Sequence, residues 1–307
     1  MSLPEVTAEY VSGVLPARKE VSRKGQNGRV LVVGGSPLYH GAPIYAGLAA
    51  YRTGVDLVYL AVPRPLVAAT RSLSPSFIVV PLPDVKLTMG CVHKLTRQMA
   101  RRQILADSVV IGPGIGRGRA RETATLARRV ADRELGLVLD ADSLHREVLE
   151  GVSQRRVVAT PHDGEFLRVF GEKVGEDLGD RASRVGEAAK EMGSTILLKG
   201  RIDVISDGQN TMVNRTGNCG MTVGGTGDIL SGIVAGLLSK GIPPLEAAAV
   251  ASWINGAAGD LAYGTHGFHF LSEDVVGFIP QVMKPFDRTY ISDEDRTKWA
   301  NPSGQGQ

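Results

Sequence analysis

The sequence predicts an α/β fold in which a mostly parallel central sheet lies between two layers of helices. Short apolar segments alternate with longer amphipathic segments through most of the 307 residues. The apolar segments are rich in β-branched residues and show little polar alternation, which is typical of strands that are buried on both faces. Repeated strand–helix units of this kind favour a three-layer α-β-α sandwich.

Seven segments are predicted as buried strands, most of them bounded by Gly, Pro or Asp. They are 29–36, 56–62, 77–82, 108–112, 136–142, 156–161 and 195–200. Helical patterns lie between them at 41–53, 91–105, 118–133 and 181–192. The segment 203–217, divided by Asp207-Gly208, predicts a hairpin and therefore an antiparallel edge of the sheet.

Two further helices follow the hairpin. Apolar residues between Leu230 and Leu238 recur at helical spacing, and Lys240-Gly241 ends that helix. A second helix begins at the prolines 243–244 with the sequence PLEAAAVASWING. No repeat or linker is visible, so we expect one domain. Its predicted limits are an N-terminal extension at 1–25, a domain at 26–285 and a polar C-terminal tail at 286–307.

Composition excludes several classes of protein. The net charge of +3 comes from scattered basic residues, whereas nucleic-acid-binding proteins concentrate them in a stripe, so nucleic acid is not an expected partner. Two cysteines, Cys91 and Cys219, give no disulfide framework and favour a reducing compartment. No segment of the sequence resembles a signal peptide or a membrane span. We therefore expect a cytoplasmic protein without a membrane partner.

Small and polar residues gather where the predicted strands end. Five such loops are GGSPLYHGAP (34–43), GPGIGRG (112–118), DADSLH (140–145), TPHDGE (160–165) and KGRID (199–203). In open parallel sheets, ligands bind beyond the carboxyl ends of the strands. One loop of this composition would indicate only a turn. Five of them at one edge favour an active-site cleft.

Two common nucleotide-binding motifs do not account for these loops. The Walker sequence G-x-x-x-x-G-K-[ST] is absent from the chain. The dinucleotide motif G-x-G-x-x-G begins to match at Gly112, but Arg117 stands at its third glycine and Pro113 lacks an amide donor. We reject both motifs.

The loop GGTGD at 224–228 has the composition of an anion-binding site. Its three glycines allow main-chain N–H groups to point inward, and the following helix directs its positive end to the same place. Asp228 is unexpected there, because a carboxylate repels phosphate. One interpretation is that Asp228 stabilises the helix by about 0.3–1 kcal/mol, through the interaction of its charge with the helix dipole. The other is that Asp228 is a base that takes a proton from an acceptor hydroxyl during phosphoryl transfer.

The segment GNCGMTVGGTGDILSGIVAGLL (217–238) closely resembles the glycine-rich signature of the NAD(P)H-hydrate dehydratases, which are ribokinase-like proteins. Segments 32–58, 111–117, 139–145 and 160–171 resemble the other signatures of this family, in the family's order. The resemblance extends from about residue 26 to 265. Cys219 and Val223 depart from it, because the family more often has proline and a small residue at these positions.

The resemblance implies a metabolite-repair reaction in a ribokinase-like sandwich. ADP, or ATP in eukaryotic relatives, phosphorylates the C6 hydroxyl of hydrated NADH or NADPH, and loss of phosphate restores the reduced cofactor. Asp228 would be the catalytic base, and the Gly224–Gly227 amides would stabilise the transferring phosphoryl group. Glu165 would help to hold Mg²⁺ through water.

The resemblance also assigns the binding residues. The hydrated dinucleotide would contact Ala42, Gly114, Gly116, His162 and Asp228. The adenine nucleotide would contact Lys199, Gly200, Arg201, Ile202, Asp203, Asn218, Gly224, Gly225, Thr226 and Gly227. Without the resemblance, His162 would be taken as a surface histidine and Lys199 as an ordinary lysine at a strand end.

Assembly and partners follow from the same resemblance. It implies a homotetramer and a functional partnership with NAD(P)H-hydrate epimerase, whose Asn-Gly-rich signature is absent here, so we expect a stand-alone dehydratase. Two other functions stay open: a small-molecule kinase of the same fold, for example one that acts on a vitamin precursor, and a non-catalytic nucleotide sensor. The kinase would share GGTGD but would account less well for TPHDGEF and GGSPLYHGAP.

Overall fold

A nine-stranded sheet forms the centre of the computed structural model, which describes residues 3–293, 295 and 296. Its strand order is β10-β9-β8-β7-β6-β5-β2-β3-β4. Strands β2 to β8 run parallel, and β9 and β10 are antiparallel to their neighbours, as the sequence predicted. The strands are β2 (Arg29–Val33), β3 (Leu57–Pro63), β4 (Ile78–Leu82), β5 (Ser108–Ile111), β6 (Gly136–Leu139), β7 (Val157–Ala159), β8 (Thr195–Leu198), β9 (Asp203–Ser206) and β10 (Thr211–Asn214).

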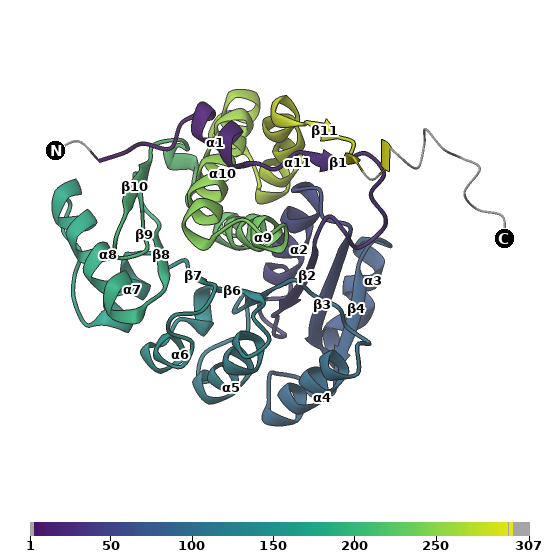
Figure 1. Cartoon of the computed structure of the whole chain (residues 1–307). Helices are drawn as coiled ribbons and strands as arrows, with labels where there is room; N and C mark the ends of the chain where they lie inside the picture. The colour runs from purple at the N-terminus through teal and green to yellow at the C-terminus, as the bar shows by residue number, and fades with distance from the viewer. Residues whose placement is uncertain (1–2, 294, 297–307) are drawn as a thin grey trace.

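Helices cover both faces of the sheet, so the predicted three-layer sandwich is confirmed (Figure 1). One layer consists of α2 (Ala42–Arg52), α9 (Thr226–Ser239), α10 (Pro244–His266) and α11 (Ser272–Met283). The other contains α4 (Met89–Ala100), α5 (Ala120–Ala131) and α6 (Arg146–Glu150), with α8 (Leu178–Met192) over β8 and β9. The remaining α-helices are α1 (Ala8–Val14), α3 (Val67–Leu73) and α7 (Asp163–Phe170).

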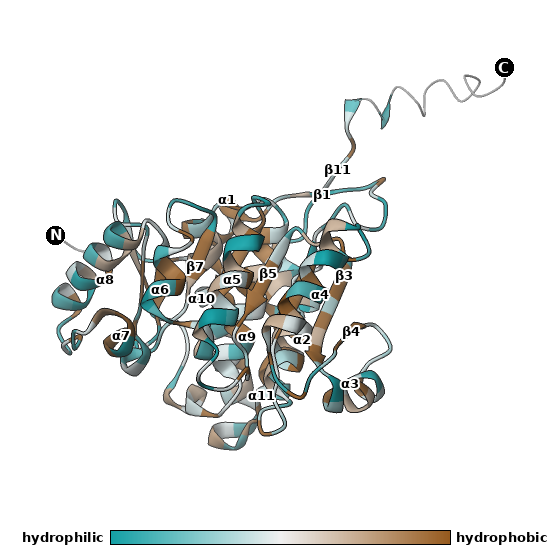
Figure 2. Cartoon of the chain, turned by 90° about the horizontal axis from the view of Figure 1, so that it is seen from below, coloured by the Kyte–Doolittle hydropathy of each residue, from teal (hydrophilic) through white to brown (hydrophobic). Residues whose placement is uncertain are grey.

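Burial on both faces explains why the strands look uniformly apolar. In β2, Val30 and Val32 point into the layer that contains α9, whereas Leu31 and Val33 point into the layer that contains α5. All four side chains are fully buried. Figure 2 shows the strands in brown between helices whose outward faces are largely teal. None of the helices in the described part of the chain has both the length and the apolar content that a membrane span requires.

Several helix ends differ from their predicted positions. The helix predicted at 91–105 is Met89–Ala100, because Thr88 caps its start by accepting from the Cys91 N–H and the backbone of Arg102 turns left-handed beyond its end. Helices α1, α3, α6, α7 and α11 were not predicted. The first four have 5 to 8 residues, which is too short for a clear helical period.

Segments from both ends of the chain lie against the sandwich. Strand β1 (Arg18–Lys19) pairs in parallel with β11 (Thr289–Tyr290), and Glu5 forms a bridge with Val213 of β10. The predicted polar tail lies outside the described residues from position 297 onward. Both cysteines are free thiols, with Cys91 buried and Cys219 exposed.

Helices α2 and α9 pack at very short range because glycines line the contact. A Cβ atom on Gly232 would lie 2.1 Å from the carbonyl oxygen of Ala46, and one on Gly236 would lie 2.2 Å from Thr53 Oγ1. These pairings show that the two helices run in the same direction. Since α2 begins after the loop that follows β2, and α9 begins with the glycine-rich loop, the contact brings both N-termini to one point of the sheet edge.

We predict that Gly232→Ala destabilises the protein, although alanine is the better helix former. The new methyl group would meet backbone that cannot move aside, which costs about 1–3 kcal/mol. Gly277→Ala is the matched control, because Gly277 is exposed in α11 and a Cβ there meets nothing within 4 Å. That variant should gain about 0.5–1 kcal/mol. Urea unfolding measures both, and a Gly232→Ala protein as stable as wild type would contradict the packing described.

Candidate active site

The direction in which successive strands are added to the sheet reverses between β2 and β5, and two of the predicted loops meet at this position. From β2 the chain proceeds to β3 and β4 on one side, and then returns to β5 and continues to β8 on the other. Loops that leave the two strands at such a point diverge and leave a crevice for ligand. Here they are residues 34–41 after β2 and residues 112–119 after β5. The fold therefore brings these two loops to the edge of the sheet where the sequence predicted a site.

Two of the residues predicted to contact the hydrated dinucleotide lie side by side where these loops meet. The N–H of Gly35 donates to the carbonyl oxygen of Pro113 at 2.8 Å, which joins the two loops. A Cβ atom on Gly114 would lie 2.5 Å from the carbonyl oxygen of Tyr39 and 3.1 Å from the Cβ of Ala42, at the start of α2. A larger residue at position 114 would therefore collide with the backbone of the loop that leads to α2.

The two other residues predicted to bind the dinucleotide have structural partners of their own. The N–H of Gly116 donates to Asp142 Oδ2 at 3.0 Å. His162 is the N-cap of α7, where its Nδ1 accepts from the N–H groups of Gly164 and Glu165 at 3.0 and 3.3 Å. Glu165 completes a capping box by accepting from the His162 N–H at 2.9 Å. The His162 side chain stays 59% exposed, and its Nε2 lies 3.6 Å from Glu165 Oε1.

Lys199 lies among carboxyl groups at the end of β8. Its Nζ donates to Asp140 Oδ1 at 3.1 Å and lies 3.7 Å from Glu165 Oε2. Asp140 is 1% exposed and also accepts from Thr160 Oγ1 at 2.8 Å. Burial opposes the charge of Lys199, but the carboxylates of Asp140, Glu165 and Asp228 outweigh it and raise the pKa of Lys199. The site thus keeps a positive charge beside the glycine-rich loop.

Asp228 lies in the first turn of α9, directly after the glycine-rich loop. Burial raises its pKa to about 7, with a further contribution from Asp140 and Glu165 and opposition from Lys199. A carboxylate that only stabilised the helix dipole would have its pKa lowered instead. At neutral pH this group can both take up and release a proton, which is the property of a general base. The second of the two sequence interpretations of Asp228 is therefore favoured.

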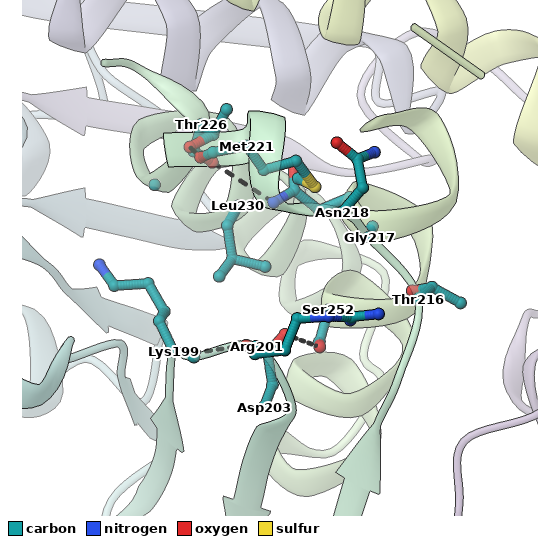
Figure 3. A pocket seen from close by; sticks show the side chains of 14 residues that line it. Lys199, Arg201, Asp203, Thr216, Gly217, Asn218, Met221, Thr226, Leu230 and Ser252 are labelled. Atoms are coloured by element: carbon teal, nitrogen blue, oxygen red, sulfur yellow. Dashed lines mark hydrogen bonds between the residues drawn. The ribbon is translucent and has the colours of Figure 1, made fainter. Parts of the chain in front are cut away.

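A cavity of about 120 Å³ lies beside the start of α9 (Figure 3). Figure 3 shows Lys199 at one end of it and Thr216 and Asn218 at the other. Seven of the ten residues predicted for the adenine nucleotide line it: Lys199, Gly200, Arg201, Asp203, Asn218, Thr226 and Gly227. The Lys199 Nζ lies 3.4 Å from where a Cβ of Gly227 would be, so the ammonium lies directly beside the first turn of α9, and both favour an anion at this end of the cavity.

The other three predicted nucleotide residues face elsewhere. Ile202 packs against the cluster beneath α8. Gly224 is exposed. Gly225 has a φ of 112° and forms the N-cap of α9, where a Cβ would lie 2.9 Å from the ring of Tyr45 and 2.8 Å from Ser272 Oγ. The glycine-rich loop is thus a thin wall between the cavity and helix α2.

Asp203 lines the cavity and links the loop after β8 to helix α10 through hydrogen bonds. Its Oδ1 accepts from the Gly200 N–H at 2.9 Å, and its Oδ2 accepts from Ser252 Oγ at 2.5 Å. Burial raises the pKa of Asp203, although these hydrogen bonds favour the ionised form. Both carboxylate oxygens are thus used within the protein, so Asp203 positions the loop that begins at Lys199.

Sequence reasoning missed four residues that shape the site. Asp140 follows a strand in a turn-like sequence, and only its position at the shared sheet edge could have singled it out. Tyr45, Ser252 and Asn255 lie within helices, and their sequence gives no sign that they face the site. The Tyr45 hydroxyl donates to Glu273 Oε1 at 2.7 Å, which ties α2 to α11, and its burial raises the pKa of Tyr45 to about 12.

These features define an α/β protein of the ribokinase-like fold, with a cavity beside the start of α9 and one acidic residue in the first turn of that helix. Residues 30–281 match the family model for NAD(P)H-hydrate dehydratase. The chain belongs to this family.

Named relatives agree with this assignment. The chain is 50% identical to the ADP-dependent (S)-NAD(P)H-hydrate dehydratase of Cenarchaeum symbiosum (strain A), over 94% of this chain and 99% of the relative. It is 44% identical to the bifunctional NAD(P)H-hydrate repair enzyme of Pyrobaculum aerophilum, over 88% of this chain and 53% of the relative. It is also similar to the ADP/ATP-dependent NAD(P)H-hydrate dehydratase from Bacillus subtilis, co-crystallised with ATP/Mg²⁺. That match has a TM-score of 0.81 and 28% identity, and covers 94% of this chain and 100% of the other.

We predict that Asp228→Asn stabilises the protein at alkaline pH. The folded-state pKa of about 7 is above the ordinary aspartate value of 3.8, so the stability contributed by this carboxyl group is full below about pH 4 and is lost as pH rises through 7. The raised pKa corresponds to a change in the free energy of unfolding of at most about 4 kcal/mol. Partial exposure of the carboxyl group reduces this change to about 1–3 kcal/mol. Urea unfolding at pH 5 and pH 8.5 tests this. A stability gain that did not grow between the two pH values would contradict it.

Proposed function

We propose that the protein is an ADP-dependent dehydratase that converts hydrated NADH and NADPH back to the reduced cofactors. The observation that carries this proposal is the Asp228 carboxyl group, whose pKa is raised to about 7 in the first turn of α9, directly after Gly227 of the cavity wall. The 50% identity to an archaeal relative with this activity, over almost the full length of both chains, supports it.

In the proposed reaction, each of these residues has a separate role. Asp228 takes the proton of the C6 hydroxyl, whose oxygen forms a bond to the β-phosphorus of ADP while the bond from that phosphorus to the bridging oxygen breaks and AMP leaves. Lys199 and the N–H groups of the glycine-rich loop offset the charge of the transferring group. Phosphate, a far better leaving group than hydroxide, then leaves C6 while C5 loses a proton to water, which forms the C5=C6 double bond of the reduced cofactor.

The residues around Lys199 fit a magnesium ion that arrives with the nucleotide. Three carboxyl groups face one ammonium there, and Mg²⁺ prefers carboxylate, water and phosphate oxygens. Glu165 Oε2 accepts from the His162 N–H, so we propose that Glu165 acts through water. Within the described residues no group of three or more His, Cys, Asp or Glu side chains is arranged to hold a metal unaided. Bound Mg²⁺ would neutralise the charge of the polyphosphate.

The wider setting of the enzyme is also a proposal. We infer a cytoplasmic homotetramer from the family resemblance, and one domain at 26–285 with an extension before it and a tail after it. A functional link to NAD(P)H-hydrate epimerase is supported by the bifunctional repair enzyme, of which the chain matches about half.

We predict that the purified protein restores absorbance at 340 nm when hydrated NADH is supplied with ADP and Mg²⁺. Asp228→Asn should lower the rate by about 100- to 10,000-fold, because the general base is lost, while ADP still binds. Asp132→Asn, an exposed substitution at the end of α5, is the control and should keep full activity. Accumulation of a phosphorylated product without recovery at 340 nm would favour a kinase, and no turnover with either ADP or ATP would contradict the proposal.

The activity should also depend on pH with a defined sign. Because Asp228 must be ionised to accept the proton, kcat/KM should rise with pH through about 7 and then level off. Steady-state rates between pH 5.5 and 9 give this profile. A rate that fell across this range would mean that the protonated group is the active form.

A further inference from the structure

One buried polar atom in the nucleotide cavity lacks a partner. Asn255 of α10 lines the cavity and is 7% exposed. Its Nδ2 donates to the carbonyl oxygen of Thr226 at 3.4 Å, but its Oδ1 has no hydrogen-bond partner among the described residues. A buried carbonyl oxygen without a donor destabilises a fold, so such atoms are rare and call for a physical explanation.

The neighbours of Asn255 on α10 are already used within the protein. Ser252, one turn earlier, donates its hydroxyl to Asp203. Gly256 lies against the loop that follows β10, where a Cβ would be 2.2 Å from Thr216 Oγ1. Asn255 therefore presents an acceptor that the chain itself does not satisfy, on the helix face that borders the cavity.

The chemistry of the atom limits what can satisfy it. An amide oxygen only accepts hydrogen bonds, and the phosphate oxygens of a bound nucleotide at neutral pH are acceptors too, so the phosphates would be repelled. The phosphate end of the cavity already has Lys199 and the start of α9. Donors on the nucleoside are the 6-amino group of adenine and the hydroxyls of ribose. The contact of the amide to Thr226 is long, at 3.4 Å, and opposes rotation of the amide group only weakly.

We propose that Asn255 Oδ1 accepts a hydrogen bond from the nucleoside of ADP, and that Asn255 thereby determines which nucleotides the enzyme binds. This inference rests on the proposed function, because it takes ADP as the nucleotide. It adds a specificity-determining residue on α10 to the loops at 199–203 and 218–227.

The test is a set of binding measurements on the full chain by isothermal titration calorimetry with Mg²⁺. The ligands are ADP, inosine diphosphate (which lacks the 6-amino group), 2′-deoxy-ADP and 3′-deoxy-ADP. One of the three analogues should bind the wild type about 5- to 100-fold more weakly than ADP, and its identity shows which donor reaches Asn255. Asn255→Leu and Asn255→Ala remove the acceptor. In these variants the ratio of that analogue's dissociation constant to the dissociation constant of ADP should fall to about one.

Two further variants separate recognition from a general weakening. Asn255→Asp keeps an acceptor, so it should preserve the discrimination even if the added charge lowers every affinity. Arg201→Ala, at another part of the cavity, should weaken all four ligands by the same factor and leave the ratios unchanged.

The outcomes that would overturn the inference are distinct from those that would overturn the proposed function. Equal binding of all four nucleotides by the wild type, or an unchanged ratio in both Asn255→Leu and Asn255→Ala, would rule out Asn255 as the recognition residue while ADP binding stands. Failure of the wild type to bind ADP at all would overturn both.

Discussion

The packing of α9 on α2, with no side chain between the backbones at Gly232, is the contact on which the site depends. It holds the N-terminus of α9 beside that of α2, at the edge where β2 and β5 send their loops apart. Ala42 and Gly114 lie at the α2 side of this point, and the cavity lined by Lys199 and Gly227 lies at the α9 side. Asp228 is in the first turn of α9, directly after the glycine-rich loop.

Burial and neighbouring charges together determine whether Asp228 and Lys199 are ionised. Removal from water makes the ionised form of Asp228 unfavourable and would also make the ammonium of Lys199 unfavourable. The two groups respond differently because of their neighbours. Lys199 gains from the carboxylates around it and stays charged, whereas Asp228 is repelled by the same carboxylates. One cluster of side chains thus provides both a permanent cation for phosphate and a base whose pKa is near neutrality.

The sequence predicts the architecture well, since the strands are buried on both faces and carry unbroken apolar runs. Strand ends of a parallel sheet share one edge, so the loops of the site could also be placed together. Helix ends were less predictable, since a local cap such as Thr88 sets them. Tyr45 and Asn255 could not be predicted, because a residue in mid-helix faces the site only through the packing of that helix. The sequence around Asp140 gave little indication that this residue belongs to the site, because aspartate after a strand is usually a turn residue.

A phosphoryl donor and an alcohol must approach within bonding distance in the proposed reaction, and the glycine-rich loop is suited to separate them until they do. Gly224, Gly225 and Gly227 have no side chains, so at these positions only backbone lies between the cavity that Gly227 lines and the Tyr45 ring that Gly225 contacts. Gly225 has no room for a methyl group, because Tyr45 and Ser272 press against it from the side of α2 and α11. The same loop supplies N–H groups at the start of α9, where negative charge would accumulate during the proposed transfer, and Asp228 follows it in the first turn of that helix.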